Sequence, residues 1–83
     1  MRQEYKYIKF IELHEGSAHR KFICFTNNGE ASKSIGEVLF SMRVGSIVYK
    51  QAKYIEHDFT SQTLIDIADF LKQVNMDAGL TTP

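Results

Sequence analysis

The sequence lacks most of the residues around which specialised sites are built. Its 83 residues include one cysteine, so neither an intramolecular disulfide nor a zinc site of several cysteines can form. No apolar run is long enough for a signal peptide or a membrane span, and we expect a cytoplasmic protein. Ten basic side chains balance ten acidic ones, which leaves no general attraction to nucleic acid or to a membrane surface.

Catalytic and ligand-binding motifs are also missing. His14, Glu15 and His19 fall in one predicted loop and His57 and Asp58 in another, but their spacing matches no metal-ligand motif. No glycine-rich phosphate loop precedes a helical stretch, and no serine lies in a nucleophile motif. We therefore predict that the protein is not an enzyme and has no catalytic residue, no metal site and no cofactor.

The sequence is rich in β-forming residues up to its last quarter. Runs of Tyr, Ile, Phe and Val predict strands over residues 4–13, 20–26, 34–41 and 46–51, with a short fifth strand over 53–59 as an alternative. The pair Asn28-Gly29 predicts a hairpin turn, because both residues tolerate a positive φ. In the next connection Gly45 is expected to be the residue with a positive φ.

The hydrophobic period then changes to that of a helix, predicted over 61–75 with Thr60 or Ser61 as its N-cap. The predicted packing face holds the apolar side chains Leu64, Ile65, Ile67, Ala68, Phe70, Leu71 and Val74. The predicted solvent face holds the polar side chains Asp66, Asp69, Lys72 and Gln73.

Together these elements predict one α+β domain over residues 1–83. It is an antiparallel meander sheet of four strands, or five, with one C-terminal helix packed across one face. We expect an ordered core over about 4–75 and a flexible tail over 76–83.

The strands are apolar on both faces, but one helix covers only one face of a sheet. If Val38 and Phe40 point toward the helix, Leu39 and Val48 point away from it. Such a patch suggests a protein partner or a second subunit. The alternative is that sheet curvature, the 14–19 loop or the tail covers it.

The connection "SMRVGS", residues 41–46, is unusual for a turn that only reverses the chain. Met42 and Arg43 suit interfaces, since methionine adapts to varied surfaces and arginine offers a planar fork of donors. Val44 fits either a contact surface or a plug in the core. The candidate partner-binding residues are Leu39, Met42, Arg43, Val44 and Val48.

Three segments carry a resemblance to known proteins: "YIKF" at 7–10, "IGEVLFSMRVGSIVY" at 35–49 and "FTSQTLIDIADFL" at 59–71. In this order and spacing they resemble a family of short uncharacterised proteins encoded by bacteria, phages and other mobile elements. The family pattern is a "YIKF"-like strand, then "LGxIxWYxxWRxYxF", then "F…LxDIADFL". The chain departs from it at the two tryptophans, where it has Phe40 and Val44.

The resemblance implies the fold and an accessory role toward a bacterial host, and no catalytic activity. We therefore predict a small protein-binding module that inhibits a host defence protein in the bacterial cytoplasm. One alternative is a homodimeric adaptor. The other is a single-stranded nucleic-acid-binding domain, which would use Tyr49 and Tyr54 with the cations Arg20, Lys21, Lys33, Arg43, Lys50 and Lys53.

Overall fold

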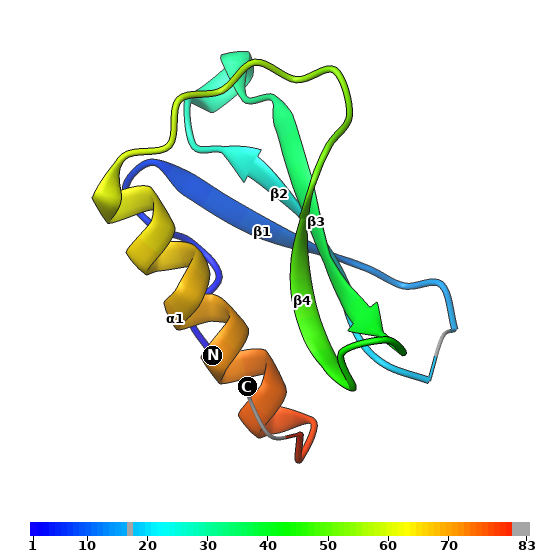
Figure 1. Cartoon of the computed structure of the whole chain (residues 1–83). Coiled ribbons are helices and arrows are strands. Elements are labelled where there is room, and N and C mark those ends of the chain that lie inside the picture. Colours follow the sequence, from blue (N-terminus) through cyan, green and yellow to red (C-terminus); the bar gives the residue numbers. More distant parts are fainter. Residues whose placement is uncertain (17, 81–83) are drawn as a thin grey trace.

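The computed structural model describes residues 1–16 and 18–80 (Figure 1). In chain order its elements are β1 (Ile8–Leu13), β2 (Lys21–Thr26), the 3-10 turn η1 (Gly29–Ala31), β3 (Ser34–Ser41), β4 (Ser46–Gln51) and α1 (Ser61–Asp77). The strands form one sheet in the order β1-β2-β3-β4, and neighbours are antiparallel. The predicted α+β meander with one C-terminal helix is therefore confirmed.

The first strand is shorter than predicted, because the N-terminal segment folds back along it. The Tyr5 N–H donates to the Ile8 carbonyl over 2.9 Å, and the Phe10 N–H donates to the Gln3 carbonyl over 2.8 Å. This reversal places the Tyr5 ring in the core, edge-on to Phe10. The segment before Ile8 thus becomes a short flap on β1 and not part of the regular ladder.

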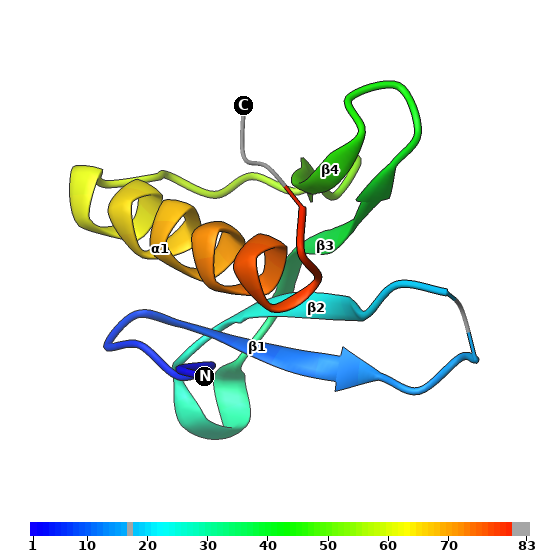
Figure 2. The same ribbon diagram turned by 90° about the horizontal axis from the view of Figure 1, so that it is seen from below.

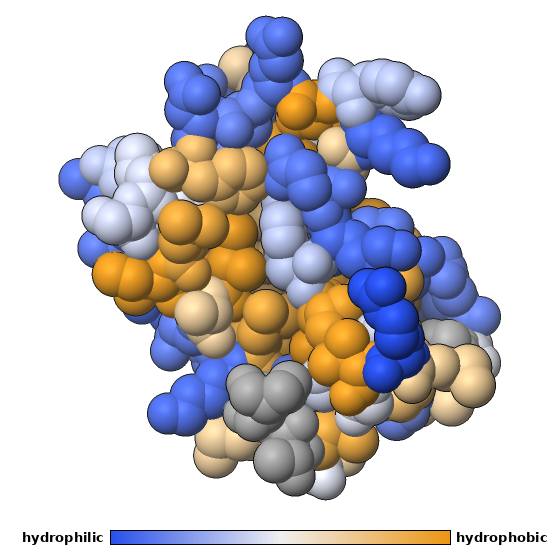
Figure 3. All heavy atoms as spheres, in the orientation of Figure 1, coloured by the Kyte–Doolittle hydropathy of each residue, from blue (hydrophilic) through white to orange (hydrophobic). Residues whose placement is uncertain are grey.

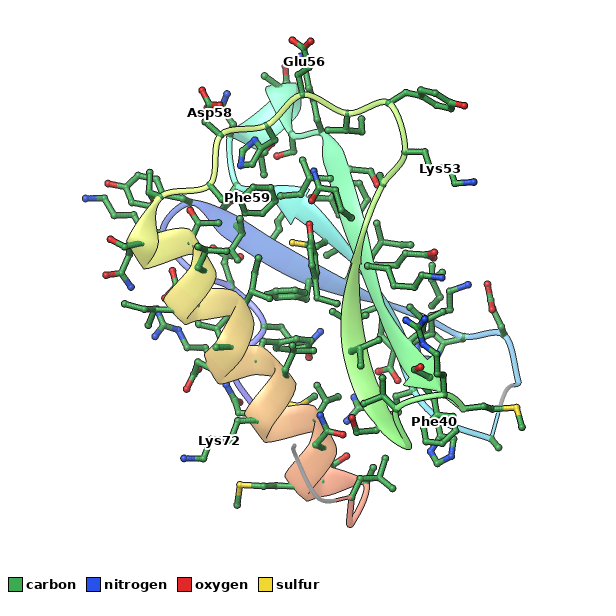
Figure 4. The ribbon with its side chains drawn as sticks, viewed as in Figure 1. Phe40, Lys53, Glu56, Asp58, Phe59 and Lys72 are labelled. Carbon is green, nitrogen blue, oxygen red and sulfur yellow. The ribbon has the colours of Figure 1, made fainter. Side chains whose placement is uncertain are left out.

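No fifth strand forms over 53–59, all of which the structure describes. Tyr54 takes a φ of 63°, in the left-handed region that a bulky residue rarely adopts and that ends an extended run. Residues 52–60 instead cross from the end of β4 to the start of α1 (Figure 1). Phe59 on this connection points inward and meets Tyr49 edge-on, at 6.2 Å between ring centroids (Figure 4).

The two predicted turns have different outcomes. Gly45 has a φ of 79°, as expected, between β3 and β4. Between β2 and β3, Asn28 keeps a negative φ of −132° and Gly29 opens η1, so the chain makes a longer turn than an Asn-Gly hairpin. The register of β2 against β3 also shifts between Cys24 and Phe25, a bulge that bends the sheet at that point.

The sheet is curved, and α1 lies along its concave side between the β1–β2 half and the β3–β4 half (Figure 2). Phe70 is the centre of the core: its ring stacks on Phe10 at 3.9 Å between centroids and meets Phe22 edge-on at 4.9 Å. The remaining core residues surround these rings and are Tyr5, Ile8, Cys24, Ile35, Val38, Ile47, Ile67 and Val74.

The helix is turned about its axis relative to the prediction. Leu64 and Ile65 are 54% and 59% exposed and Ala68 is also exposed, so the prediction that they pack in the core is wrong. Asp66, predicted to face solvent, is only 7% exposed and accepts a hydrogen bond from Gln62 over 2.9 Å. The orientation follows from Phe70, whose ring fills the space between Phe10 and Phe22.

The start of α1 agrees with the prediction, while its end extends further. Thr60 is the N-cap, and its side chain accepts from the Thr63 N–H. The flexible tail was predicted to begin at residue 76. In the structure the helix continues to Asp77, and Leu80 packs against the core, where its N–H donates to the Asn75 carbonyl over 2.8 Å. Residues 81–83 of that prediction lie outside the described residues.

Gly36 on β3 is required by a ring on the neighbouring strand. The Tyr49 side chain crosses Gly36, and a Cβ added there would lie 2.6 Å from Tyr49 Cε1. We expect Gly36→Ala to lower the free energy of unfolding by about 1–3 kcal/mol, because the packed ring must move. Urea denaturation tests this. In the background Tyr49→Leu the cost of Gly36→Ala should fall markedly, and an equal cost in both backgrounds would contradict the ring-contact explanation.

Candidate protein-binding surface

Leu39 and Val48 lie directly opposite each other on β3 and β4, on the face of the sheet away from α1. Both are partly exposed, whereas their neighbours Val38 and Ile47 are buried on the helix face. The predicted facing of β3 therefore agrees with the structure. The outer face also carries partly exposed Ile23, but its neighbour on β3 is Glu37, which pairs with Lys21 at 3.5 Å, so the apolar pair Leu39–Val48 lies beside charged side chains.

The β3–β4 tip projects from the body of the protein. Met42 is 91% exposed and Val44 is 46% exposed, which excludes Val44 as a plug in the core. Ser41 closes the turn: its carbonyl accepts from the Gly45 N–H over 2.7 Å and its hydroxyl from the Val44 N–H over 3.3 Å. The exposed side chains are thus held on a hydrogen-bonded turn.

Four of the five predicted residues come together around one shallow hollow of about 510 Å³. Leu39, Arg43, Val44 and Val48 line it, and Met42 lies outside its wall. The remaining lining residues are Phe40, Ser41, Tyr49 and Lys50. We call this group of nine residues, Met42 included, the hairpin surface.

A second apolar surface was not foreseen from the sequence. It lies on the side of α1 beside β4 and consists of Leu64, Ile65, Ala68 and Leu71, and Figure 3 shows hydrophobic atoms running from α1 toward β4. The available signal was the width of the helical stripe, which had more apolar positions than one packing face needs. Val48 connects this surface to the hairpin surface, since it also lines the hollow between α1 and β4.

Asn75, near the end of α1, ties the helix to the outer edge of β4. Its side chain accepts from the Ile47 N–H over 2.8 Å and donates to the carbonyls of Ile47 and Leu71, each over 2.9 Å. Asn75 is fully buried, so these bonds replace water for both backbone groups of Ile47. This role could not be predicted from the sequence, because an asparagine in a last helical turn is ordinarily solvated.

Three side chains of the kinds that serve in catalysis or metal binding, His19, His57 and Cys24, are packed against other parts of the protein. Among the described residues, no three His, Cys, Asp or Glu side chains are grouped so that they could hold a metal. His19 stacks on Phe40 at 4.2 Å and His57 meets Phe59 edge-on at 4.9 Å, so both rings pack against aromatic side chains. Cys24 is buried, and burial raises the pKa of its thiol to about 12, which keeps it protonated at neutral pH.

Two of the six cations considered for nucleic-acid binding are engaged within the protein. Arg20 makes two 2.8 Å bonds to Glu12 and a 3.1 Å bond to Asp77, which links β1 to the end of α1. The hydrogen bonds from Arg20 hold the pKa of the Glu12 carboxyl below its ordinary value. Lys21 lies 3.5 Å from Glu37 and 3.8 Å from Glu15.

Comparison with known proteins finds no matching family model, no similar curated protein and no similar solved structure. Within the described part of the chain, α1 is the one α-helix, and it is too short and too polar to pass through a bilayer.

Proposed function

We propose that the protein is a non-enzymatic, cytoplasmic protein-binding module whose hairpin surface contacts its partner. The observation that carries the proposal is the exposure of Met42 and Val44 on a closed turn beside the outward pair Leu39–Val48. Apolar side chains held in water on an ordered element are typical of interfaces.

The surface has the composition of an interaction site. A methionine and an arginine lie at its tip, and apolar residues line its hollow with Lys50 at the rim. Interfaces are enriched in methionine, arginine and aromatic residues, and a charged rim keeps such a patch soluble before binding. The neighbouring apolar side of α1 extends the same contact area (Figure 3).

The specific form of the proposal is an inhibitor of a bacterial host defence protein. The resemblance to proteins of phages and other mobile elements supports it, because such proteins act on host components. A homodimer formed through the same surface is the competing assignment, and it would leave no free surface for a host partner.

The test is enrichment of partners from extracts of the cells that make the protein. The double variant Met42→Asn, Arg43→Asp is compared with the wild type. We expect the affinity for the enriched partner to fall at least tenfold, about 1.4 kcal/mol. Stability should change by less than about 1 kcal/mol, because both substitutes suit turns.

The matched control is Met76→Asn with Lys33→Asp, which makes the same kinds of change at exposed positions away from the hairpin. It should bind like the wild type. Equal affinity of the hairpin variant and the wild type would contradict the proposal. So would a wild-type chain that sediments as a dimer which the hairpin substitutions dissociate.

A further inference from the structure

β4 is an edge strand with a partly open row of backbone groups. It pairs with β3 on one side only, and Asn75 takes both backbone groups of Ile47 on the other side. Backbone groups alternate along a strand, so the N–H and C=O of Tyr49 and Gln51 also point away from β3. The Ala52 N–H, one position further, points back to the Ile35 carbonyl at 3.0 Å, as this alternation requires.

An apolar hollow of about 310 Å³ lies along this edge, between β4 and α1. It is lined by Ser46, Ile47, Val48, Ala68, Leu71, Lys72 and Asn75. A strand added beside β4 would send alternate side chains over this hollow toward α1. Its backbone would meet the open groups of Tyr49 and Gln51, which is how sheet-edge recognition gains affinity.

Three lysines lie on or beside this edge. Lys50 lies between Tyr49 and Gln51 and points to the outer face, and its cross-strand neighbour Glu37 pairs with Lys21 at 3.5 Å. Lys53 follows β4 and Lys72 leaves α1, and both point away from the body of the protein (Figure 4). Within residues 1–16 and 18–80, none of Lys50, Lys53 and Lys72 has a carboxylate within ion-pair distance.

A second copy of the chain fits this edge poorly. If two β4 strands paired antiparallel through Tyr49 and Gln51, Lys50 would lie directly opposite Lys50 of the other copy. In such a pair the side chains are about 5 Å apart, and like charges there are destabilising. A shift toward Ile47 meets Asn75 instead. Lysine on an edge strand is a known device against self-pairing.

We propose that the open edge of β4 binds an extended segment of another protein as a fifth strand. The segment alternates apolar with acidic residues: its apolar side chains lie over the hollow beside α1 and a carboxylate lies opposite Lys50. This inference rests on the proposed protein-binding function and specifies one contact of that partner. It adds main-chain bonds at Tyr49 and Gln51 to the apolar contacts of the hairpin surface.

The test uses two blocked synthetic peptides of equal length, one alternating leucine with glutamate and one alternating leucine with lysine. Binding is followed by backbone amide NMR. We expect the glutamate peptide to bind at least tenfold more tightly, with shifts and new exchange protection at the Tyr49 and Gln51 amides. Lys50→Glu should reverse the preference between the peptides. Lys6→Glu, the same charge change at an exposed position before β1, the strand at the opposite edge of the sheet, should leave it unchanged.

Equal binding of the two peptides, shifts away from β4, or no binding would overturn the inference. A wild-type dimer joined through β4 would also overturn it, because the occupant would then be a second copy. The proposed function is tested separately. If the Met42→Asn, Arg43→Asp variant lost the cellular partner, protein binding would be supported even if no peptide bound to β4.

Discussion

Replacing Phe70 by alanine is expected to lower the free energy of unfolding by about 3–5 kcal/mol. Phe70 is fully buried, and its ring stacks on Phe10 and meets Phe22 edge-on, so it joins the helix to β1 and β2 at once. Alanine leaves a cavity at the centre of a small domain, and domains of this size have little total stability to lose. Urea or thermal denaturation followed by circular dichroism measures the loss.

Leu71→Ala is the matched control for this prediction. Leu71 is the next residue on α1 but is only partly buried, at the border of the hollow beside β4. Its truncation should cost clearly less than that of Phe70. A larger cost at Leu71 would mean that the helix packs with the face predicted from the sequence, and the observed rotation of α1 would be wrong.

Asn75→Ala should lower the free energy of unfolding by about 2–4 kcal/mol, because it leaves the buried N–H and C=O of Ile47 without partners. Hydrogen exchange gives the local readout: the Ile47 amide should lose protection, and the Val48 amide, which faces β3, should keep most of it. Asn75→Asp preserves the size and the acceptor for the Ile47 N–H but removes both donations.

The Asp variant separates shape from hydrogen bonding. If Asn75→Asp were as stable as the wild type at neutral pH, the donations to Ile47 and Leu71 would contribute nothing. If Asn75→Ala changed stability by less than about 0.5 kcal/mol, Asn75 would have no role in holding α1 to β4.

The strands next to the hairpin surface were predictable in detail. The predicted ranges 34–41 and 46–51 coincide with β3 and β4, because β-forming runs on either side of Gly45 leave little freedom in where the strands end. The partial exposure of Leu39 and Val48 was also predictable. Successive side chains of a strand point to opposite faces of the sheet, and a single helix covers only one of those faces.

The orientation of α1 was not predictable from periodicity. Leu64, Ala68 and Leu71 form one apolar stripe and Ile67, Phe70 and Val74 an adjacent one, and hydropathy does not say which stripe meets the sheet. The choice depends on the space between the rings of Phe10 and Phe22, which the ring of Phe70 fills.

Two further features have no signal in the local sequence. The hydrogen bonds between the Asn75 side chain and the Ile47 backbone require the end of α1 to contact β4, and the two residues are 28 apart in the sequence. The positive φ of Tyr54, which ends the predicted fifth strand, has no counterpart in local propensity, since tyrosine favours strands. Local patterns therefore predicted the elements, while long-range contacts decided which of their surfaces stay open.

Site-specific photo-crosslinking in the cells that make the protein tests the central claim most directly. A photoreactive residue is placed at Met42 or Lys50, on the hairpin surface, and at Glu30 or Lys6, exposed positions outside it. The account predicts adducts with the same second protein from Met42 and Lys50, and none from Glu30 or Lys6. Equal adducts from all four positions, no adduct from any, or adducts of only two copies of this chain would contradict it.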